Sequence, residues 1–181
     1  TSVVRTVFAK VIGVDSFTVR ATATACSPCS VKPLDIMIVL DRTGSMCQFS
    51  NGSNDPACTD LNNARNGIKT FLGLMNPQFH HVGLAVLPPS TGTTRNLQCS
   101  PPTTPSTASY DSPTASYLMA PLSSDYASPP GSLNAGSTLV DRIECQRVGG
   151  GRTGYANALD AAQAQLQSAN GRPGVQKIIV F

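Results

Sequence analysis

Asp35-Ile-Met-Ile-Val-Leu-Asp-Arg-Thr-Gly-Ser-Met46 is the stretch that decides the fold. Its first half, with Leu34 before it, is almost entirely apolar, which is typical of a strand buried on both faces at the centre of a parallel sheet. The run ends in a carboxylate, Asp41, and hydroxyl residues follow at alternate positions, Thr43 and Ser45. Ligands of open α/β sheets bind at the carboxyl ends of the strands. Three hard oxygen ligands without a lysine favour a divalent cation such as Mg²⁺ over a phosphate.

The pattern Asp41-x-Thr43-x-Ser45 resembles the first metal-ion-dependent adhesion site (MIDAS) motif, D-x-S-x-S, of von Willebrand factor A (vWA) domains. Thr43 replaces the first serine of that motif and keeps the hydroxyl group. The resemblance implies an α/β fold of the Rossmann-like, doubly wound kind with a mostly parallel sheet. It also implies that Thr43 and Ser45 bind the cation (Mg²⁺, or Mn²⁺ or Ca²⁺) through their hydroxyls, with Asp41 bound directly or through water.

Periodicity and breaker residues place the remaining elements in the order that the resemblance implies. His81-Val-Gly-Leu-Ala-Val-Leu87 is similar to a strand of the A domain, and Tyr117–Leu122 to its short third strand, followed by an L-[ST]-x-D turn that ends at Asp125. The predicted elements are a helix from Thr59 or Asp60 to Leu74, strands at 81–87 and 117–122, helices at 137–148 and 155–169, and a strand at 175–181.

A second metal element is expected in the glycine-rich turn Gly149-Gly-Gly-Arg-Thr-Gly154. A P-loop would require a lysine that this turn lacks. The resemblance to the G-G-x-T turn of A domains assigns Thr153 to the site, directly or through water, and glycines allow the turn to approach the metal loop closely. Asp160 in the following helix is expected to face solvent and is not counted as a ligand.

The last predicted strand, 175–181, is where a third metal motif would begin in the family, with an aspartate in a [ST]-D-G turn. The sequence ends at Phe181 before any such aspartate. A sheet that stops on a buried strand leaves an open hydrophobic edge. We therefore expect a vWA domain that is truncated after its fourth strand.

Composition argues for a protein outside the cytoplasm. Charged residues are 13% of the 181 residues, against roughly 25% in ordinary domains, and the net charge is +3 without a basic run. Nucleic acid is therefore an unsuitable partner. No apolar run is long enough to span a membrane, and no leader peptide is present in the sequence. An extracellular or cell-surface location is expected, with any leader or anchor removed or lying outside this sequence.

Six cysteines, an even number, predict up to three disulfides in an oxidising compartment. Spacing leaves fifteen connectivities open, and the pairs that we favour are Cys26–Cys29, Cys47–Cys58 and Cys99–Cys145. A zinc or redox role for Cys26-Ser-Pro-Cys29 is the alternative, and zinc would need a second pair that the sequence lacks. Asn51-Gly-Ser53 is a formal N-glycosylation acceptor.

Two domains of unequal size are predicted: an N-terminal β-rich segment with a linker at 1–33, and the vWA-like domain at 34–181. Within the larger one, residues 88–131 are rich in Ser, Thr and Pro, typical of an O-glycosylated surface insertion. In the smaller one, period-two alternation at 17–25 predicts a strand, whereas 3–12 fits a helix or a strand. The segment resembles the region upstream of the A domain in TadG-like proteins of the Tad pilus-assembly group, and a simple β-hairpin is the equal alternative.

Two functions follow from the resemblance. The first is adhesion or pilus association, in which a cation at the site binds a carboxylate of a protein or extracellular-matrix ligand. The second is a structural subunit of a filament or other surface assembly, whose A domain packs against other chains. Catalysis is not expected, because Ser45 lacks a G-x-S-x-G elbow. His80 and His81 stand at the start of their strand, the end opposite the predicted site, where solvent or capping roles are expected.

Overall fold

A computed structural model describes residues 2–5, 16–19, 32–91, 115–128, 131–149 and 154–181. The chain divides into two units, residues 1–31 and 32–181. In the first, strand β1 (Ser2–Arg5) pairs antiparallel with β2 (Ser16–Val19), so that Ser2 lies opposite Val19. The alternative that the sequence left open at the start of the chain is therefore resolved in favour of a strand at residues 2–5.

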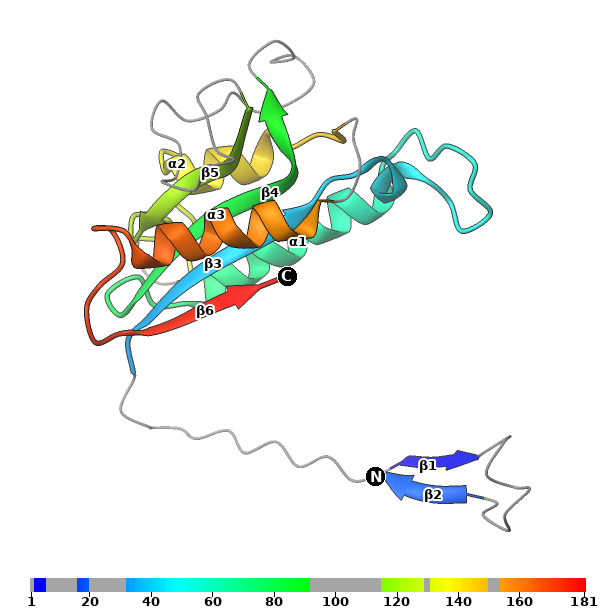
Figure 1. Cartoon of the computed structure of the whole chain (residues 1–181), viewed down its shortest axis with the longest axis horizontal. Helices are drawn as coiled ribbons and strands as arrows, with labels where there is room; N and C mark the ends of the chain where they lie inside the picture. Colours follow the sequence, from blue (N-terminus) through cyan, green and yellow to red (C-terminus); the bar gives the residue numbers. More distant parts are fainter. Residues whose placement is uncertain (1, 6–15, 20–31, 92–114, 129–130, 150–153) are drawn as a thin grey trace. The chain divides into compact units, whose positions relative to one another are not determined.

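The second unit contains one four-stranded mixed sheet (Figure 1). Its strands in chain order are β3 (Leu34–Asp41), β4 (His80–Thr91), β5 (Ala115–Ser123) and β6 (Gln176–Val180). Their order across the sheet is β5-β4-β3-β6. Strand β3 is parallel to both β4 and β6, and only β5 runs antiparallel to its neighbour β4. The predicted α/β fold with a mostly parallel sheet is confirmed at this level.

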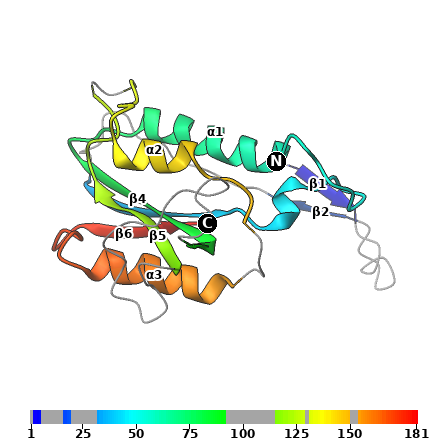
Figure 2. The same ribbon diagram turned by 90° about the horizontal axis from the view of Figure 1, so that it is seen from above.

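Helices cover both faces of the sheet, which gives three layers (Figure 2). Helices α1 (Thr59–Leu74) and α2 (Thr138–Glu144) lie on one face, and α3 (Tyr155–Gln167) lies on the other. A short 3-10 helix, η2 (Gly44–Cys47), follows β3 directly. In the part of the chain that the structure describes, no helix is both long and apolar enough to cross a membrane.

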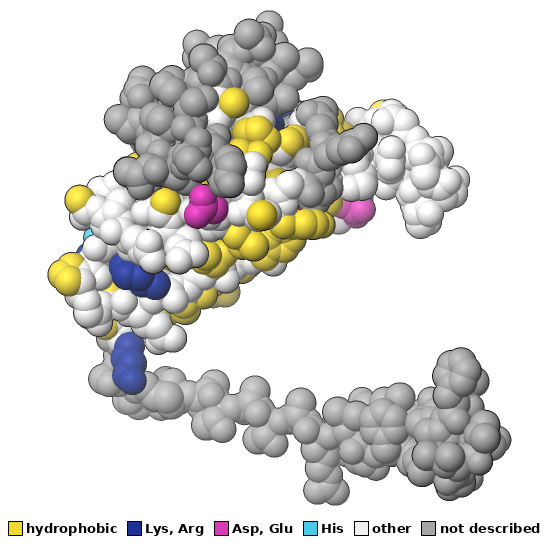
Figure 3. All heavy atoms as spheres, viewed as in Figure 1, with side chains coloured by type: hydrophobic (Ala, Val, Ile, Leu, Met, Phe, Trp, Pro, Cys, Tyr) yellow, Lys and Arg dark blue, Asp and Glu magenta, His cyan; other side chains and the backbone are white. Residues whose placement is uncertain are grey.

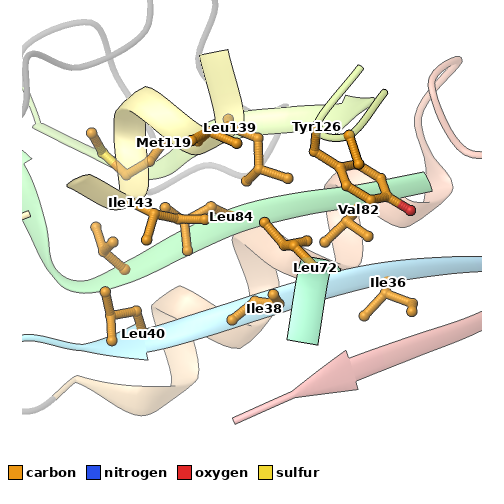
Figure 4. Packing of buried hydrophobic residues seen from close by; sticks show 14 of the residues in the cluster. Ile36, Ile38, Leu40, Leu72, Val82, Leu84, Met119, Tyr126, Leu139 and Ile143 are labelled. Atoms are coloured by element: carbon orange, nitrogen blue, oxygen red, sulfur yellow. The ribbon is translucent and has the colours of Figure 1, made fainter. Parts of the chain in front are cut away.

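Strand β3 is buried on both faces, as its apolar run predicts. Successive side chains of a strand point to opposite faces. Ile36 and Ile38 accordingly join the core under α1 and α2, where Leu72 is fully buried (Figure 4). Met37 and Val39 join a second core, which the alanines on the inner side of α3 close. Burying each large aliphatic side chain contributes about 2 kcal/mol, so this strand organises both halves of the core.

Two predicted boundaries and one orientation need correction. Strand β4 continues through Pro88 to Thr91, because β5 pairs alongside and Ser90 lies opposite Ser116. Helix α2 ends at Glu144 rather than 148, because the backbone after it is held against the loop that follows β3. In α3, helical spacing predicts that Leu159 faces the sheet, but Leu159 is 37% exposed and Ala161 is fully buried instead. The first described residues of the Ser/Thr/Pro-rich insertion at 88–131 thus belong to the sheet.

The strand order determines where a ligand site belongs. Numbered by their order in the second unit, the strands follow 3-2-1-4, the first four positions of the doubly wound order 3-2-1-4-5-6. After β3 the chain proceeds through α1 to β4 on one side, whereas β6 joins β3 on the other side. The order therefore reverses between β3 and β6. In open α/β sheets, ligands bind outside the carboxyl ends of the strands at such a reversal.

Candidate metal site

The candidate site is the loop at the carboxyl end of β3, where the order of the strands reverses. Asp41 is the last residue of β3, and one of its carboxylate oxygens accepts a hydrogen bond from the backbone N–H of Thr43 at 2.8 Å. The hydroxyl oxygens of Thr43 and Ser45 lie 3.0 Å apart, within hydrogen-bond distance. Three predicted ligands of the cation are thus brought together by one tight loop.

The donor set fits a small, hard cation. Metal–oxygen distances in magnesium sites are about 2.0–2.1 Å, so adjacent ligands of an octahedron lie about 2.9 Å apart. The 3.0 Å between the hydroxyl oxygens of Thr43 and Ser45 is close to that spacing. Thr43 is buried, Asp41 is half-buried and Ser45 is exposed, so the loop opens to solvent on the side of Ser45. An arriving ligand would reach a bound cation from that side.

Thr153, the fourth predicted ligand, lies outside the described residues, and its assignment stays a prediction. Gly149, at the start of the predicted glycine-rich turn, is described and lies against the metal loop. Its N–H donates to the carbonyl of Arg42 at 2.7 Å. A Cβ atom at this position would lie 2.7 Å from Cγ of Pro88, which is too close for any side chain. The predicted close approach of glycine backbone is confirmed at this residue.

Arg42 is the functional residue that sequence reasoning missed. Its side chain is fully buried, and its guanidinium donates to the carbonyl of Pro88 from Nε (3.2 Å) and Nη2 (3.0 Å). Nη1 donates to the carbonyl of Arg147 at 3.3 Å. Burial lowers the pKa of Arg42 to about 10, so the group remains charged at neutral pH. This one side chain holds together the metal loop, the end of β4 and the segment that leads to Gly149.

A disulfide closes the loop between the site and α1. Cys47 and Cys58 are bonded, as predicted, with their Cα atoms 4.0 Å apart. Inside this loop, buried Asp55 accepts hydrogen bonds from the N–H groups of Ala57 (2.9 Å) and Thr59 (2.7 Å) at the start of α1. The bonds from Thr59 are the main reason that the pKa of Asp55 is lowered. The segment between Cys47 and Cys58 is therefore fixed at both ends: the disulfide joins it to the residues that follow Ser45, and Asp55 joins it to α1.

The other cysteines and the glycosylation motif are less completely described. Cys145 is disulfide-bonded, whereas Cys26, Cys29 and Cys99 lie outside the described residues, so the remaining pairs stay predictions. Asn51 is exposed, and its side-chain oxygen accepts hydrogen bonds from the N–H (3.0 Å) and hydroxyl (2.6 Å) of Ser53. The acceptor asparagine is thus accessible, and its modification stays a prediction.

An apolar groove lies beside the site, between α1 and β6. It has a volume of about 400 Å³ and is lined by Asp41 at one end and otherwise mainly by apolar side chains, among them Ile68, Phe71 and Phe181. Val180 and Phe181 are 41% and 61% exposed. Hydrophobic side chains form a band over this part of the molecule in Figure 3. The outer edge of β6 has no partner strand among the described residues.

The opposite end of β3 carries a carboxylate with a different environment. Asp35 is fully buried and accepts hydrogen bonds from the backbone N–H (2.7 Å) and Nε (2.8 Å) of Arg172, with Lys177 at 3.6 Å. A charged residue inside an apolar run is a sequence signal for a buried ion pair. Asp35 carries that signal, and sequence reasoning missed it. The ion pair lies at the amino ends of the strands, away from the candidate site.

The histidines also lie at that amino end, as predicted. Of the two roles expected there, exposure to solvent or capping, burial rules out exposure for His80. His80 is 8% exposed, and burial, with the nearby charge of Arg172, lowers its pKa. His81 is half-buried and its pKa is lowered by the same two causes. Within the described ranges, no group of three or more His, Cys, Asp or Glu side chains is placed to hold a metal. The candidate site contains one such side chain, Asp41, and two hydroxyl residues, so it is not a group of that kind.

Comparison with known proteins adds no identification, since neither a family model nor a curated protein matches the chain. Function is therefore inferred from the fold, the order of its strands and the geometry of the loop that follows β3.

Proposed function

We propose that the chain is a vWA-type domain that binds a protein or extracellular-matrix ligand through a divalent cation held by Asp41, Thr43 and Ser45. The observation that carries the proposal is the gathering of these three oxygen-bearing side chains at the reversal of strand order. The 3.0 Å spacing of the hydroxyls supports Mg²⁺ more than the larger Ca²⁺, with Mn²⁺ as the close chemical substitute.

The chemistry of such a site is recognition of acidic groups. A bound cation supplies a coordination position that a carboxylate of the partner can fill, because hard cations prefer oxygen ligands. Thr43 and Ser45 contribute neutral oxygens, and Asp41 contributes the one negative charge among these three residues. A site with so little negative charge of its own leaves most of the charge of the cation to attract the partner. Thr153 completes the proposed set.

The resemblance to TadG-like proteins and the Cys47–Cys58 disulfide support a location on the cell surface or outside the cell. In that setting the domain acts in adhesion or is associated with a pilus. A cation-dependent contact suits this role, because calcium and magnesium are available there at concentrations that would saturate a weak site.

Binding of Mn²⁺ to the metal-free full chain, measured by electron paramagnetic resonance, tests the proposal. We expect saturable binding by one ion, competition by Mg²⁺, and at least a tenfold loss of affinity in Asp41→Ala. Asp160→Ala is the matched control, because Asp160 is an exposed carboxylate on α3 and no proposed ligand. Equal Mn²⁺ affinity in the two variants would refute the site.

A second function is favoured by the apolar groove and by the outer edge of β6, which pairs with no strand in the described part of the chain. An edge strand with exposed apolar neighbours can accept a strand from another chain, which is a common mode of assembly. In this alternative the domain is a structural subunit of a filament or surface assembly. Ordered filaments that form and persist in EDTA would favour assembly, whereas a metal-dependent monomer that captures acidic peptides would favour adhesion.

A further inference from the structure

A second pocket lies between the start of α1 and the segment that follows α2. It has a volume of about 530 Å³, within the range of ligand-binding pockets. Apolar atoms of Pro56, Leu61 and Val148 contribute to its lining, together with the side chains of Arg65 and Arg147. Asp41, Thr43 and Ser45 do not line it. The pocket therefore combines two guanidinium groups with apolar walls at a place that the metal site does not use.

The positive charge in this pocket exceeds its negative charge. Glu144 is shared by Arg65 (3.0 Å) and Lys69 (2.6 Å), and hydrogen bonds from these two cations lower its pKa, so it is ionised at neutral pH. Arg147 donates only to the backbone carbonyls of Glu144 (3.0 Å) and Gln146 (2.9 Å) and has no ion pair among the described residues. Arg65 and Lys69 thus share the one carboxylate of Glu144, and the charge of Arg147 adds to theirs without a carboxylate of its own among the described residues.

Arg65 also retains unused hydrogen-bonding capacity. Its Nη1 donates to the side-chain oxygen of Asn62 at 3.0 Å, and its Nη2 pairs with Glu144. Its Nε is buried and has no hydrogen-bond partner in the described part of the chain. A buried donor without a partner is unfavourable, so a further acceptor for this N–H would be favourable.

The walls of the pocket are held in place before any ligand arrives. Cys58 adopts a left-handed backbone conformation (φ 48°) and is bonded to Cys47. On the other side, the carbonyl of Arg147 accepts a hydrogen bond from buried Arg42. A preformed pocket loses little entropy when it binds, which favours recognition of a small group.

We propose that this pocket binds a carboxylate carried on an apolar body, from a peptide segment of a protein partner. A guanidinium group is matched to a carboxylate, and the apolar lining is matched to the carbon atoms that bear it. The carboxylate belongs either to an acidic side chain or to a chain terminus, and both place the same chemistry in the pocket. The walls are tied to the loop of Asp41, Thr43 and Ser45 through Cys47 and Arg42, so the pocket and the candidate cation site share the same structural supports.

Nuclear magnetic resonance of the arginine Nε–H groups tests this proposal while small carboxylates are titrated into the full chain. EDTA is present throughout, so that the result does not depend on the metal site. N-acetyl-leucine represents a chain-terminal carboxylate, N-acetyl-glutamate α-amide represents an acidic side chain, and N-acetyl-leucinamide is the neutral control. We expect a saturable shift of the Arg65 Nε–H signal with at least one of the two carboxylates, and none with the amide.

Variants assign the binding to the pocket. Arg147→Gln removes an exposed charge that forms no ion pair and should weaken carboxylate binding about tenfold, the loss of one charge-assisted hydrogen bond. Lys32→Gln, which removes an exposed charge elsewhere on the domain, should leave the affinity unchanged. The proposal is overturned by an absent Arg65 shift, by an equal shift with the neutral amide, or by equal affinity in the two variants. The thermal unfolding midpoint confirms that each variant is folded.

Discussion

Asp35 and Asp41 stand at the two ends of the same strand and illustrate opposite uses of a carboxylate. Asp35 is fully buried, and the guanidinium of Arg172 and the amine of Lys177 surround it. Asp41 is half-buried and accepts one hydrogen bond, from the N–H of Thr43 in its own loop. The first carboxylate has its charge compensated within the fold, whereas the second retains capacity for a ligand. The difference indicates which end of the sheet stabilises the domain and which end is free to bind.

The largest effect that would test this comparison is on stability. Asp35→Ala leaves Arg172 partly buried without its partner, and we expect a loss of about 3 kcal/mol in the free energy of unfolding. Asp41→Ala removes one hydrogen bond in a partly exposed loop, so we expect a loss of about 1 kcal/mol or less. Urea denaturation of both variants in EDTA measures the difference. Equal losses would show that the two carboxylates do not differ in the way described.

A change at Arg42 sharpens the comparison by uncoupling the metal loop from the rest of the sheet. Arg42→Met keeps the length of the side chain but leaves the carbonyls of Pro88 and Arg147 without their donor, and we expect a loss of about 2 kcal/mol in the free energy of unfolding.

Because the loop would then be less ordered, Mn²⁺ affinity should fall in Arg42→Met although no proposed ligand has changed. In Asp35→Ala, at the other end of β3, the Mn²⁺ affinity should remain within about twofold of that of the unmodified chain, since the effects of distant sites are largely independent. Loss of Mn²⁺ affinity in Asp35→Ala would contradict the separation of the two ends.

The smallest effect expected is in the pH dependence of stability. His80 has a lowered pKa, because burial and the charge of Arg172 disfavour its protonated form in the folded state. The unfolded chain therefore binds the proton more readily, so the stabilisation is fully present above about pH 6.5 and is lost as the pH falls toward the folded-state pKa. His80→Gln should flatten the dependence of the urea midpoint between pH 7 and pH 5. An unaltered slope in His80→Gln would contradict the assignment.

Local patterns were sufficient to place the elements. The apolar run of β3, the helical spacing of α1 and the breakers at Gly171 and Pro173 are short-range signals, and the structure confirms these elements. The Asp41-x-Thr43-x-Ser45 spacing likewise acts within one loop, and its three side chains do lie together. Helix α2 was predicted too long, because its end depends on contacts with a loop about 100 residues earlier in the chain.

The sequence by itself determined the α/β class, the buried central strand and the tight loop of Asp41, Thr43 and Ser45, because each rests on the period of a helix or strand or on the spacing within one turn. Only the tertiary structure decided that Arg42 joins three segments, that Arg172 compensates Asp35, and that Arg65 and Arg147 share a pocket. Arg42 meets Pro88 and Arg147 across 46 and 105 positions of the chain, and Arg172 meets Asp35 across 137 positions. Such pairings depend on how the layers pack, and no local pattern encodes them.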